Sequence, residues 1–372
     1  MLLKKIIAML VVFFFFIIAF DNFIFDNTDS SPDSDSCTQS SAITSNDNDR
    51  TDRRAFTQPD IISRIELEST IIELVFIPGT DLVAVERFDP SGSIVEIWNW
   101  ADSTMIRRLD SNLTSIRSMD VSNNGKQLAL GGSVTWLYAS EDLAIEIWNL
   151  EDYTRTNTLK NFSRQFYDLQ FDSTGNYLIT TGGPNRGVQS WSLPEFSNHH
   201  IIRGHFSWLG GEVKHISLDT TSSCAVIVER VRGTTGGDDI MLLNMENGQT
   251  DTFPRMSIET TYVQFLSDDK SILSTHSDGS IRLWDIHSFE ELDSHSVSNT
   301  KNYRSLFAYA GSTAVSGQRR SSKLEIVSVH ENSLHVSSFD TSLDLKAIDI
   351  TENGDYLGVG AAEHIRVYEI RR

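Results

Sequence analysis

Residues 274–285 read STHSDGSIRLWD, two short segments of alternating character joined by Asp278 and Gly279. Alternation with a period of two is typical of β-strands, and an Asp-Gly pair between two such segments is typical of a tight hairpin turn. The second segment ends on Trp284 and Asp285. The stretch therefore predicts a β-hairpin that closes on a large aromatic residue.

The second half of that hairpin recurs along the chain. Its seven copies read IVEIWNW, AIEIWNL, VQSWSL, IMLLNM, SIRLWDI, KLEIVSV and HIRVYEI. The aligned large residues lie between 41 and 52 residues apart and are Trp98, Trp148, Trp191, Leu243, Trp284, Val327 and Tyr368. One four-stranded blade of a β-propeller occupies about 40–45 residues. Residues 63–372 are therefore predicted to form one all-β domain, a seven-bladed β-propeller.

The pattern resembles that of the WD-repeat family, whose blade closes on a Trp-Asp pair after an Asp-Gly turn. In that family a buried network joins a Gly-His pair, a strand hydroxyl, a turn Asp and the Trp. This chain keeps parts of the network, because Asp278 and Trp284 occur together while Pro254 and Arg255 stand at the Gly-His position. The resemblance implies a fold and no catalytic chemistry. The residues it marks as structural repeat positions are Trp98, Trp148, Trp191, Asp278, Trp284, Asp285 and Tyr368.

The two ends of this domain predict how the ring closes. The last strand-like segment, residues 365–370, is followed only by Arg371 and Arg372, so the seventh blade lacks an outermost strand. The alternating segment SRIELES, residues 63–69, stands just before the first inner strand. An N-terminal strand added to the last blade would close the ring and remove exposed sheet edges. We therefore expect residues 63–69 to complete blade seven.

The N-terminal sequence predicts a membrane-targeting segment. Lys4 and Lys5 precede residues 6–20, which carry no polar side chain. A helix over residues 6–25 is long enough to cross a bilayer at about 1.5 Å per residue, and Ala19 is the only small residue near a plausible cleavage point. We predict that residues 1–25 form an uncleaved helical signal anchor with the propeller outside the cytoplasm. The alternatives are secretion after signal cleavage, or a propeller inside the cytoplasm if the charge rule fails.

The segment between anchor and propeller is polar. Residues 26–62 are dominated by Ser, Asp, Asn and Thr and are predicted to be a disordered linker. Its Cys37 and the later Cys224 are the only two cysteines. Two cysteines make neither a disulfide framework nor a four-ligand zinc site. Cys224 opens an apolar segment, so we expect it to pack as a buried small hydrophobic residue.

Charge and missing motifs narrow the function. The chain has 31 Lys and Arg against 51 Asp and Glu, a net charge of −20, which argues against nucleic acid as a partner because phosphates must be neutralised by cations. The sequence contains no zinc-protease, nucleophile-elbow or phosphate-loop motif. We therefore expect no enzymatic activity, no cofactor and no metal.

Propellers of this family generally bind partners on the face built from two sets of loops. One set enters each inner strand, and the other joins the second strand to the third. Aromatic and arginine side chains dominate interface energetics, and the arginines of these loops predict a positive rim that attracts an acidic protein or peptide. The predicted partner-binding residues are Trp136, Tyr138, Phe162, Arg164, Arg186, Phe206, Trp208, Arg232, Tyr303, Arg304, Arg319 and Arg320.

The sequence thus predicts a non-enzymatic scaffold for protein-protein interaction, tethered to a membrane. The alternative is an exported propeller enzyme or small-ligand binder, similar to propeller lactonases and hydrolases, that uses the central channel. Glu73, Asp168 and His215 lie on predicted inner strands and have suitable side chains for such a site. Nothing in the sequence brings these three residues together.

Overall fold

The structure is a computed structural model of the 372-residue chain, and the statements below concern the residues that it describes. These are Cys37 and residues 59–135, 142–162, 166–182, 187–193, 196, 199–203, 212–230, 237–296 and 305–370. The chain divides into Met1–Ser36 and Cys37–Arg372, and all described residues belong to the second unit. The predicted anchor over residues 1–25 and most of the predicted linker lie outside them. No helix among these residues is long and apolar enough to cross a membrane.

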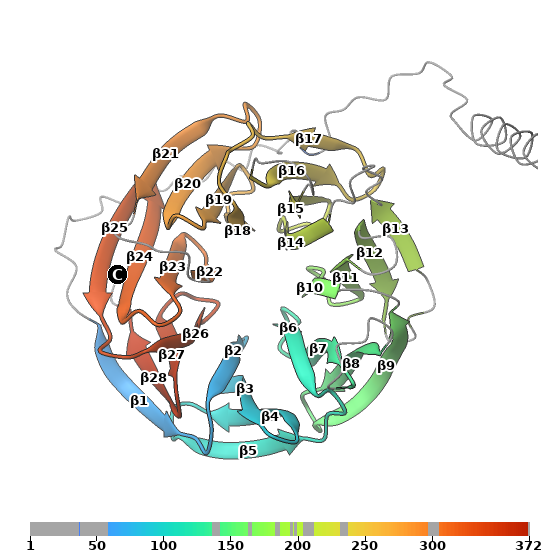
Figure 1. Ribbon diagram of the computed structural model, residues 1–372, viewed down its shortest axis with the longest axis vertical. Helices are drawn as coiled ribbons and strands as arrows, with labels where there is room; N and C mark the ends of the chain where they lie inside the picture. The colour runs from blue at the N-terminus through green and yellow to red at the C-terminus, as the bar shows by residue number, and fades with distance from the viewer. Residues whose placement is uncertain are drawn as a thin grey trace, which may run out of the picture. The chain divides into compact units, whose positions relative to one another are not determined.

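The second unit is a ring of seven four-stranded antiparallel sheets, each sheet forming one blade (Figure 1). From the inner to the outer strand, blade 1 contains β2 (Ile71–Ile77), β3 (Leu82–Asp89), β4 (Gly92–Asn99) and β5 (Thr104–Leu109). Blade 2 contains β6 (Ser115–Val121), β7 (Gln127–Ser133), β8 (Leu143–Asn149) and β9 (Thr154–Phe162). Blade 3 contains β10 (Phe166–Phe171), β11 (Tyr177–Gly182), β12 (Gly187–Ser192) and β13 (His199–Arg203).

The remaining blades repeat this order. Blade 4 contains β14 (Glu212–Leu218), β15 (Cys224–Arg230), β16 (Asp239–Asn244) and β17 (Thr250–Thr252). Blade 5 contains β18 (Thr260–Phe265), β19 (Ser271–His276), β20 (Ser280–Asp285) and β21 (Glu291–Ser296). Blade 6 contains β22 (Ser305–Ala310), β23 (Thr313–Gln318), β24 (Lys323–His330) and β25 (Ser333–Asp340). Blade 7 contains β26 (Leu345–Ile350), β27 (Tyr356–Ala361), β28 (His364–Glu369) and, as its outer strand, β1 (Asp60–Glu66).

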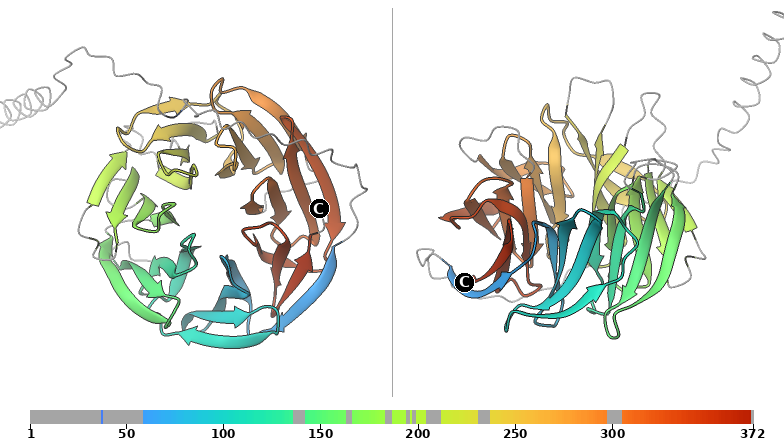
Figure 2. Two further views of the ribbon diagram at one scale, coloured as in Figure 1. Left: turned by 180° about the vertical axis from the view of Figure 1, so that it is seen from behind. Right: turned by 60° about the horizontal axis from the view of Figure 1, so that its bottom comes forward.

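The N-terminal strand closes the ring, as the sequence predicts. In Figure 2 the blue β1 lies against the red strands of blade 7, and β1 pairs with β28 in antiparallel register. The strand begins at Asp60, three residues before the expected start, so the domain includes the end of the predicted linker. Of its seven side chains only Ser63 and Ile65 are buried. Blade 7 is therefore held together by both ends of the described chain.

The core lies between neighbouring blades. The buried apolar side chains form seven clusters, and each cluster combines residues from two adjacent blades. The seven aligned large residues all fall on the third strand of their blades. Trp148, Trp284 and Tyr368 are at most 3% exposed. Alternation in the strands thus supplies two apolar faces, one for each neighbouring blade.

A tight approach between blades 1 and 2 requires glycine at one turn. Gly125 in the β6–β7 turn has a φ of 68°, and a Cβ there would lie 2.5 Å from the carbonyl oxygen of Pro78. An L side chain would be strained in this backbone conformation and would also clash with blade 1. The turn residues therefore fix the spacing of the blades as well as the hairpin.

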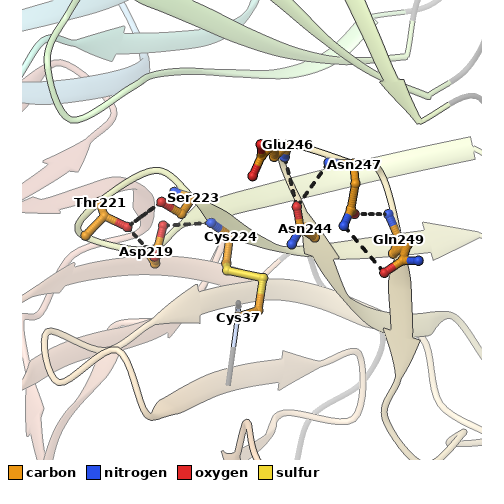
Figure 3. Close-up of a disulfide and its surroundings, with 9 residues drawn as sticks. All are labelled: Cys37, Asp219, Thr221, Ser223, Cys224, Asn244, Glu246, Asn247 and Gln249. Carbon is orange, nitrogen blue, oxygen red and sulfur yellow. Dashed lines mark hydrogen bonds between the residues drawn. A yellow bond between two sulfur atoms is a disulfide. The ribbon is translucent and has the colours of Figure 1, made fainter. Parts of the chain in front are cut away.

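Contrary to expectation, the two cysteines form a disulfide. Cys37 and Cys224 are joined with a Cα–Cα distance of 5.8 Å, although 187 positions separate them (Figure 3). Cys224 begins β15, and its backbone N–H donates to Asp219 Oδ1 at 3.0 Å. Its burial is as predicted, at 4% exposed. The sequence does not predict this bond, because a separation of 187 positions does not show that Cys37 and Cys224 are close in space.

Candidate functional site

The two faces of the ring carry different connections. The loop face carries the segments that enter the inner strands and those that join second to third strands, and the turn face carries the other connections. The bend before Cys224 lies on the turn face, because it joins the first and second strands of blade 4. The disulfide therefore fastens Cys37 to the turn face, opposite the face expected to bind a partner.

The structure places two of the twelve predicted partner-binding side chains. Arg319 and Arg320 lie in the connection between β23 and β24, on the loop face. Arg320 is exposed, and its backbone N–H donates to the Leu345 carbonyl oxygen at 3.1 Å. The other ten side chains lie outside the described part of the chain: Trp136, Tyr138, Phe162, Arg164, Arg186, Phe206, Trp208, Arg232, Tyr303 and Arg304.

Arg319 lies closer to the ring axis than a rim residue would. It is half-buried, and its Nη2 donates to the carbonyl oxygen of Ile72 in blade 1 at 3.2 Å. The side chain of Arg319 therefore links blade 6 to the inner strand of blade 1. The charge of Arg319 lowers the pKa of Glu73 and Glu86 against a larger opposing effect of burial. The described interactions of Arg319 are therefore made with other residues of the propeller.

The inner strands share an irregularity that aligns one side chain per blade. Six of them have a register shift just before the same position, between residues 71/73, 116/118, 166/168, 213/215, 260/262 and 345/347. A β-bulge of this kind redirects the side chain that follows it. We call the aligned residues the inner belt: Glu73, Ser118, Asp168, His215, Tyr262, Phe307 and Ala347.

Neighbouring belt residues contact each other through four successive blade boundaries. Ser118 Oγ donates to Asp168 Oδ1 at 3.0 Å, and Asp168 Oδ2 lies 2.8 Å from His215 Nδ1. The ring of His215 lies 3.9 Å from that of Tyr262, and Tyr262 lies 5.8 Å from Phe307, centre to centre. The belt therefore brings together Asp168 and His215, which the sequence could not join.

A second row of polar side chains ties the inner strands to one another. Asp349 accepts the backbone N–H of Phe76, and Asp120 accepts that of Phe171, both at 2.7 Å. Gln170 and Ser217 accept backbone N–H groups of the next blade in the same way, from Leu218 and Phe265 at 3.2 and 3.0 Å. These hydrogen bonds are structural. Burial raises the pKa of both Asp120 and Asp349 to about 7 despite them.

The surroundings of Glu73 in the inner belt disfavour its ionised form. Burial raises its pKa well above the usual value, and the nearby carboxyl groups of Glu86, Asp168 and Asp349 raise it further. Within the described residues the side-chain carboxyl of Glu73 accepts no hydrogen bond and forms no ion pair. Glu86 stands opposite Glu73 in the β2–β3 ladder, and burial raises its pKa to about 7. Carboxyl groups are therefore concentrated here, and Arg319 is a described cation that acts on both Glu73 and Glu86.

The hydrogen bonds of the tryptophans differ from blade to blade. In blade 5, Trp284 Nε1 donates to Ser274 Oγ at 2.8 Å, and Ser274 contacts His276 Nε2 at 2.9 Å. His276 is fully buried on β19, and burial lowers its pKa to about 4, so it is neutral. It contacts Thr260 Oγ1 at 3.4 Å. A histidine on the second strand thus enters a network in which the family pattern expects a Gly-His pair.

Blades 1 to 3 hold their tryptophans by other groups. Trp191 Nε1 donates to Thr180 Oγ1 at 3.0 Å. Trp98 and Trp148 each donate at 3.2 Å to a glutamate two residues earlier on the same strand, Glu96 and Glu146. Asp278 and Asp285 accept backbone N–H groups in the turns that follow them, from Ser280 at 2.9 Å and from Ser288 at 2.7 Å. The tryptophans and aspartates at the structural repeat positions therefore make hydrogen bonds within their own blades and turns.

The described residues offer little for metal or nucleophilic chemistry. They contain no group of three His, Cys, Asp or Glu side chains that could hold a metal ion. Asp168 orients His215 as an acid orients a catalytic base, but the hydroxyl beside the pair belongs to Ser118 and donates to Asp168 instead. The pair thus lacks the nucleophile of a hydrolytic triad within the described part.

Comparison with known proteins agrees with this geometry. Residues 257–285 match the family model for the WD domain, G-beta repeat. The chain is 26% identical over 155 residues to the nuclear distribution protein nudF 1 of Talaromyces marneffei, a match that covers 41% of this chain and 32% of that protein. The chain therefore spans about a third of the length of this relative.

Two solved structures share the fold. The structure of U3-55K superposes with a TM-score of 0.64 at 16% identity, covering 84% of this chain and 100% of the other. The RRP9 WD40 repeats give a TM-score of 0.66 at 16% identity, covering 85% and 100%. These likenesses establish the fold alone. The chain is therefore a seven-bladed β-propeller, and residues 257–285 in blade 5 match the WD repeat.

Proposed function

We propose that this protein is a non-enzymatic interaction scaffold that presents its loop face to a protein or peptide outside the cytoplasm. The observation that carries the proposal is the WD-repeat propeller itself, whose described polar networks hold blades and tryptophans together. Scaffolds of this architecture typically bind proteins through loops on one face. The arginines in the sequence of these loops favour an acidic partner there. Nucleic acid remains an unfavoured partner because of the net charge of −20.

The disulfide supports the extracytoplasmic part of the proposal. Structural disulfides persist in oxidising compartments and are rare in the cytosol of most organisms. The bond between Cys37 and Cys224 uses both cysteines of the chain. It agrees with the apolar segment at residues 6–25, which we propose to be a signal anchor. Attachment at the turn face also leaves the loop face on the other side of the ring.

Site-specific photo-crosslinking tests the binding face. A photoreactive amino acid at Arg320, which is exposed on the loop face, is expected to crosslink a protein partner in intact cells. The matched control places it at Lys270, which is exposed in the β18–β19 turn on the opposite face. Equal crosslinking from both positions, or none from Arg320, would contradict loop-face binding.

Protease accessibility and thiol labelling test the compartment. We expect protease added to intact cells to digest the propeller, and a maleimide reagent to label no cysteine until the protein is reduced. Two adducts should then appear, one for Cys37 and one for Cys224. The intact mass separates an anchored protein, which keeps residues 1–25, from a secreted one. Protection from protease together with free thiols would place the propeller inside the cytoplasm.

The alternative of a small-ligand or hydrolytic site at the ring axis has one observation in its favour, the contact between Asp168 and His215 at 2.8 Å. A hydrolase would also need a nucleophile or a metal-bound water beside His215. Within the described residues no hydroxyl bonds to His215. The geometry therefore favours binding over hydrolysis.

A further inference from the structure

We propose that this protein associates with a second copy of itself through the outer strands of blades 7 and 1, with β1 of each copy lying along β5 of the other. The inference goes beyond the proposed function, because these strands lie on the circumference of the ring and not on the loop face. It assigns a partner, a second copy of the same chain, to apolar side chains that the outer strands leave exposed.

Exposed apolar side chains are concentrated at this one part of the circumference. The outer strands β1 and β5 carry four of the six large apolar side chains that are exposed among the described residues. These are Ile61, Ile62, Met105 and Ile106, between 43% and 52% exposed. Within the described residues no further strand pairs with either outer strand on its free side. Exposed apolar side chains on edge strands are typical of surfaces that associate.

The two strands form one continuous strip, which we call the side strip. In Figure 1 β1 and β5 follow one another around the circumference of the ring. They meet where Ser103 Oγ donates to the Arg64 carbonyl oxygen at 2.9 Å, and Ser63 Oγ lies 3.2 Å from Ser103 Oγ. The strand β1 runs toward this contact and β5 runs away from it. The contact therefore lies between the two apolar pairs.

This arrangement matches itself under two-fold rotation. An axis that passes through the contact between Arg64 and Ser103, perpendicular to the circumference, reverses both strands. It lays β1 of one copy antiparallel along β5 of the other, so that residues equally far from the contact face each other. Two residues away, position 62 faces position 105, and three residues away, position 61 faces position 106. Apolar side chains thus meet apolar side chains, as an isologous dimer requires.

The charges at the ends of the side strip are complementary in the same register. Four residues from the contact, Asp60 of one copy faces Arg107 of the other. Both residues are exposed, and Arg107 forms no ion pair within the described residues. Exposed ion pairs add little affinity, but they fix the register and disfavour shifted pairings. This complementarity favours a second copy over an unrelated protein as the occupant.

Sedimentation velocity of the full chain in a non-ionic detergent tests the inference. The salt concentration is about 0.15 M, which screens the repulsion between two acidic copies. Two convex surfaces bury less than the roughly 800 Å² per partner of a standard interface. We therefore expect a reversible dimer with a dissociation constant in the micromolar range, and a monomer below it. Ile106→Lys should weaken the dimer about tenfold or more, since it places a cation against an apolar side chain.

The matched control is Phe88→Lys, which removes an apolar side chain 50% exposed at the end of β3 in the same blade. It adds the same charge away from the side strip and should leave the dimer unchanged. Equal losses from the two variants would reduce the effect to a change in net charge and overturn the proposal. A dimer that withstands Ile106→Lys, or a wild-type chain that stays monomeric throughout, would also overturn it.

A charge exchange tests the register. Asp60→Arg and Arg107→Asp should each weaken the dimer, because each places like charges opposite one another. The double variant should restore it, since the pair is then present with its charges exchanged. Equal melting temperatures for all three variants would show that the fold is intact. If the double variant dimerised no more tightly than the single variants, this pairing of β1 with β5 would be wrong. Loop-face crosslinking from Arg320 does not depend on the side strip and would still stand.

Discussion

A Glu96→Ala variant is expected to lose about 3–5 kcal/mol of its free energy of unfolding. Glu96 and Arg87 are both buried in blade 1, with side chains 3% and 2% exposed, and Glu96 Oε1 lies 2.9 Å from Arg87 Nη2. Arg108 donates to the same oxygen at 2.8 Å, and the indole of Trp98 donates to Glu96 Oε2 at 3.2 Å. Removing the carboxylate would leave the Arg87 guanidinium buried beside a single remaining ion-pair partner, the exposed Glu68.

The charge state of Glu96 agrees with this role. Burial opposes its ionisation, yet hydrogen bonds from Arg87 and Arg108 outweigh burial and hold the pKa of Glu96 below its usual value. The stability that depends on the ionised carboxylate is therefore present at neutral pH and is lost as the pH falls through this lowered pKa. Urea unfolding at pH 7 is the appropriate measurement.

Two further variants show how the loss of stability should depend on burial of the ion pair. Glu151→Ala removes an exposed ion pair with Lys126, 2.8 Å long, and should cost at most about 1 kcal/mol. Glu146→Ala removes the equivalent carboxylate of blade 2, where the partner Arg155 is 28% exposed, so an intermediate loss is expected. If Glu96→Ala were no more destabilising than Glu151→Ala, the ion pair in blade 1 would add nothing to stability.

The repeat explains how far sequence reasoning reaches. The aligned residues from Trp98 to Tyr368 all lie on third strands, because a strand with two buried faces needs a large side chain at the same place in every blade. Ring closure by β1 was predictable because a missing strand at one end matched a spare strand at the other. Periodicity thus determines which residues lie at equivalent positions.

The repeat period does not determine which side-chain contacts the equivalent residues make. Asp168 and His215 occupy the same position of adjacent blades, so aligning the inner strands places them side by side, but their contact depends on the bulge before each. His276 enters the Trp284 network from the second strand, a place that the family pattern does not mark. The disulfide between Cys37 and Cys224 depends on the path of the linker, which has no repeat.

Removal of the closing strand should have the largest effect on the fold. A chain that begins at residue 70 is expected to aggregate or to unfold several kcal/mol more readily than one that begins at residue 59. Both chains lack Cys37, so both are made with Cys224→Ser to avoid a free thiol. Only the shorter chain lacks β1 and leaves the outer edge of β28 unpaired, and exposed strand edges promote aggregation.

The size of the effect follows from what β1 buries. Ile65 is fully buried against Ile71, Ile365 and neighbouring side chains, and burying an isoleucine contributes about 1.5–3 kcal/mol. Each hydrogen bond of the β1–β28 ladder adds about 0.5–1.5 kcal/mol. The exposed Ile61 and Ile62 contribute little of this, at 52% and 43% exposed. Size-exclusion chromatography and urea unfolding compare the two chains.

A synthetic peptide of residues 59–69 provides the complementary test. Added to the shorter chain, it should restore the monomer, because the edge of β28 accepts a strand in the register of β1. A peptide with Ile65→Asp should fail, since it would bury an unpaired carboxylate between blades 7 and 1. If the shorter chain stayed monomeric and unfolded at the same urea concentration as the longer one, closure by β1 would be dispensable, and the ring would depend on its inner strands and inter-blade clusters alone.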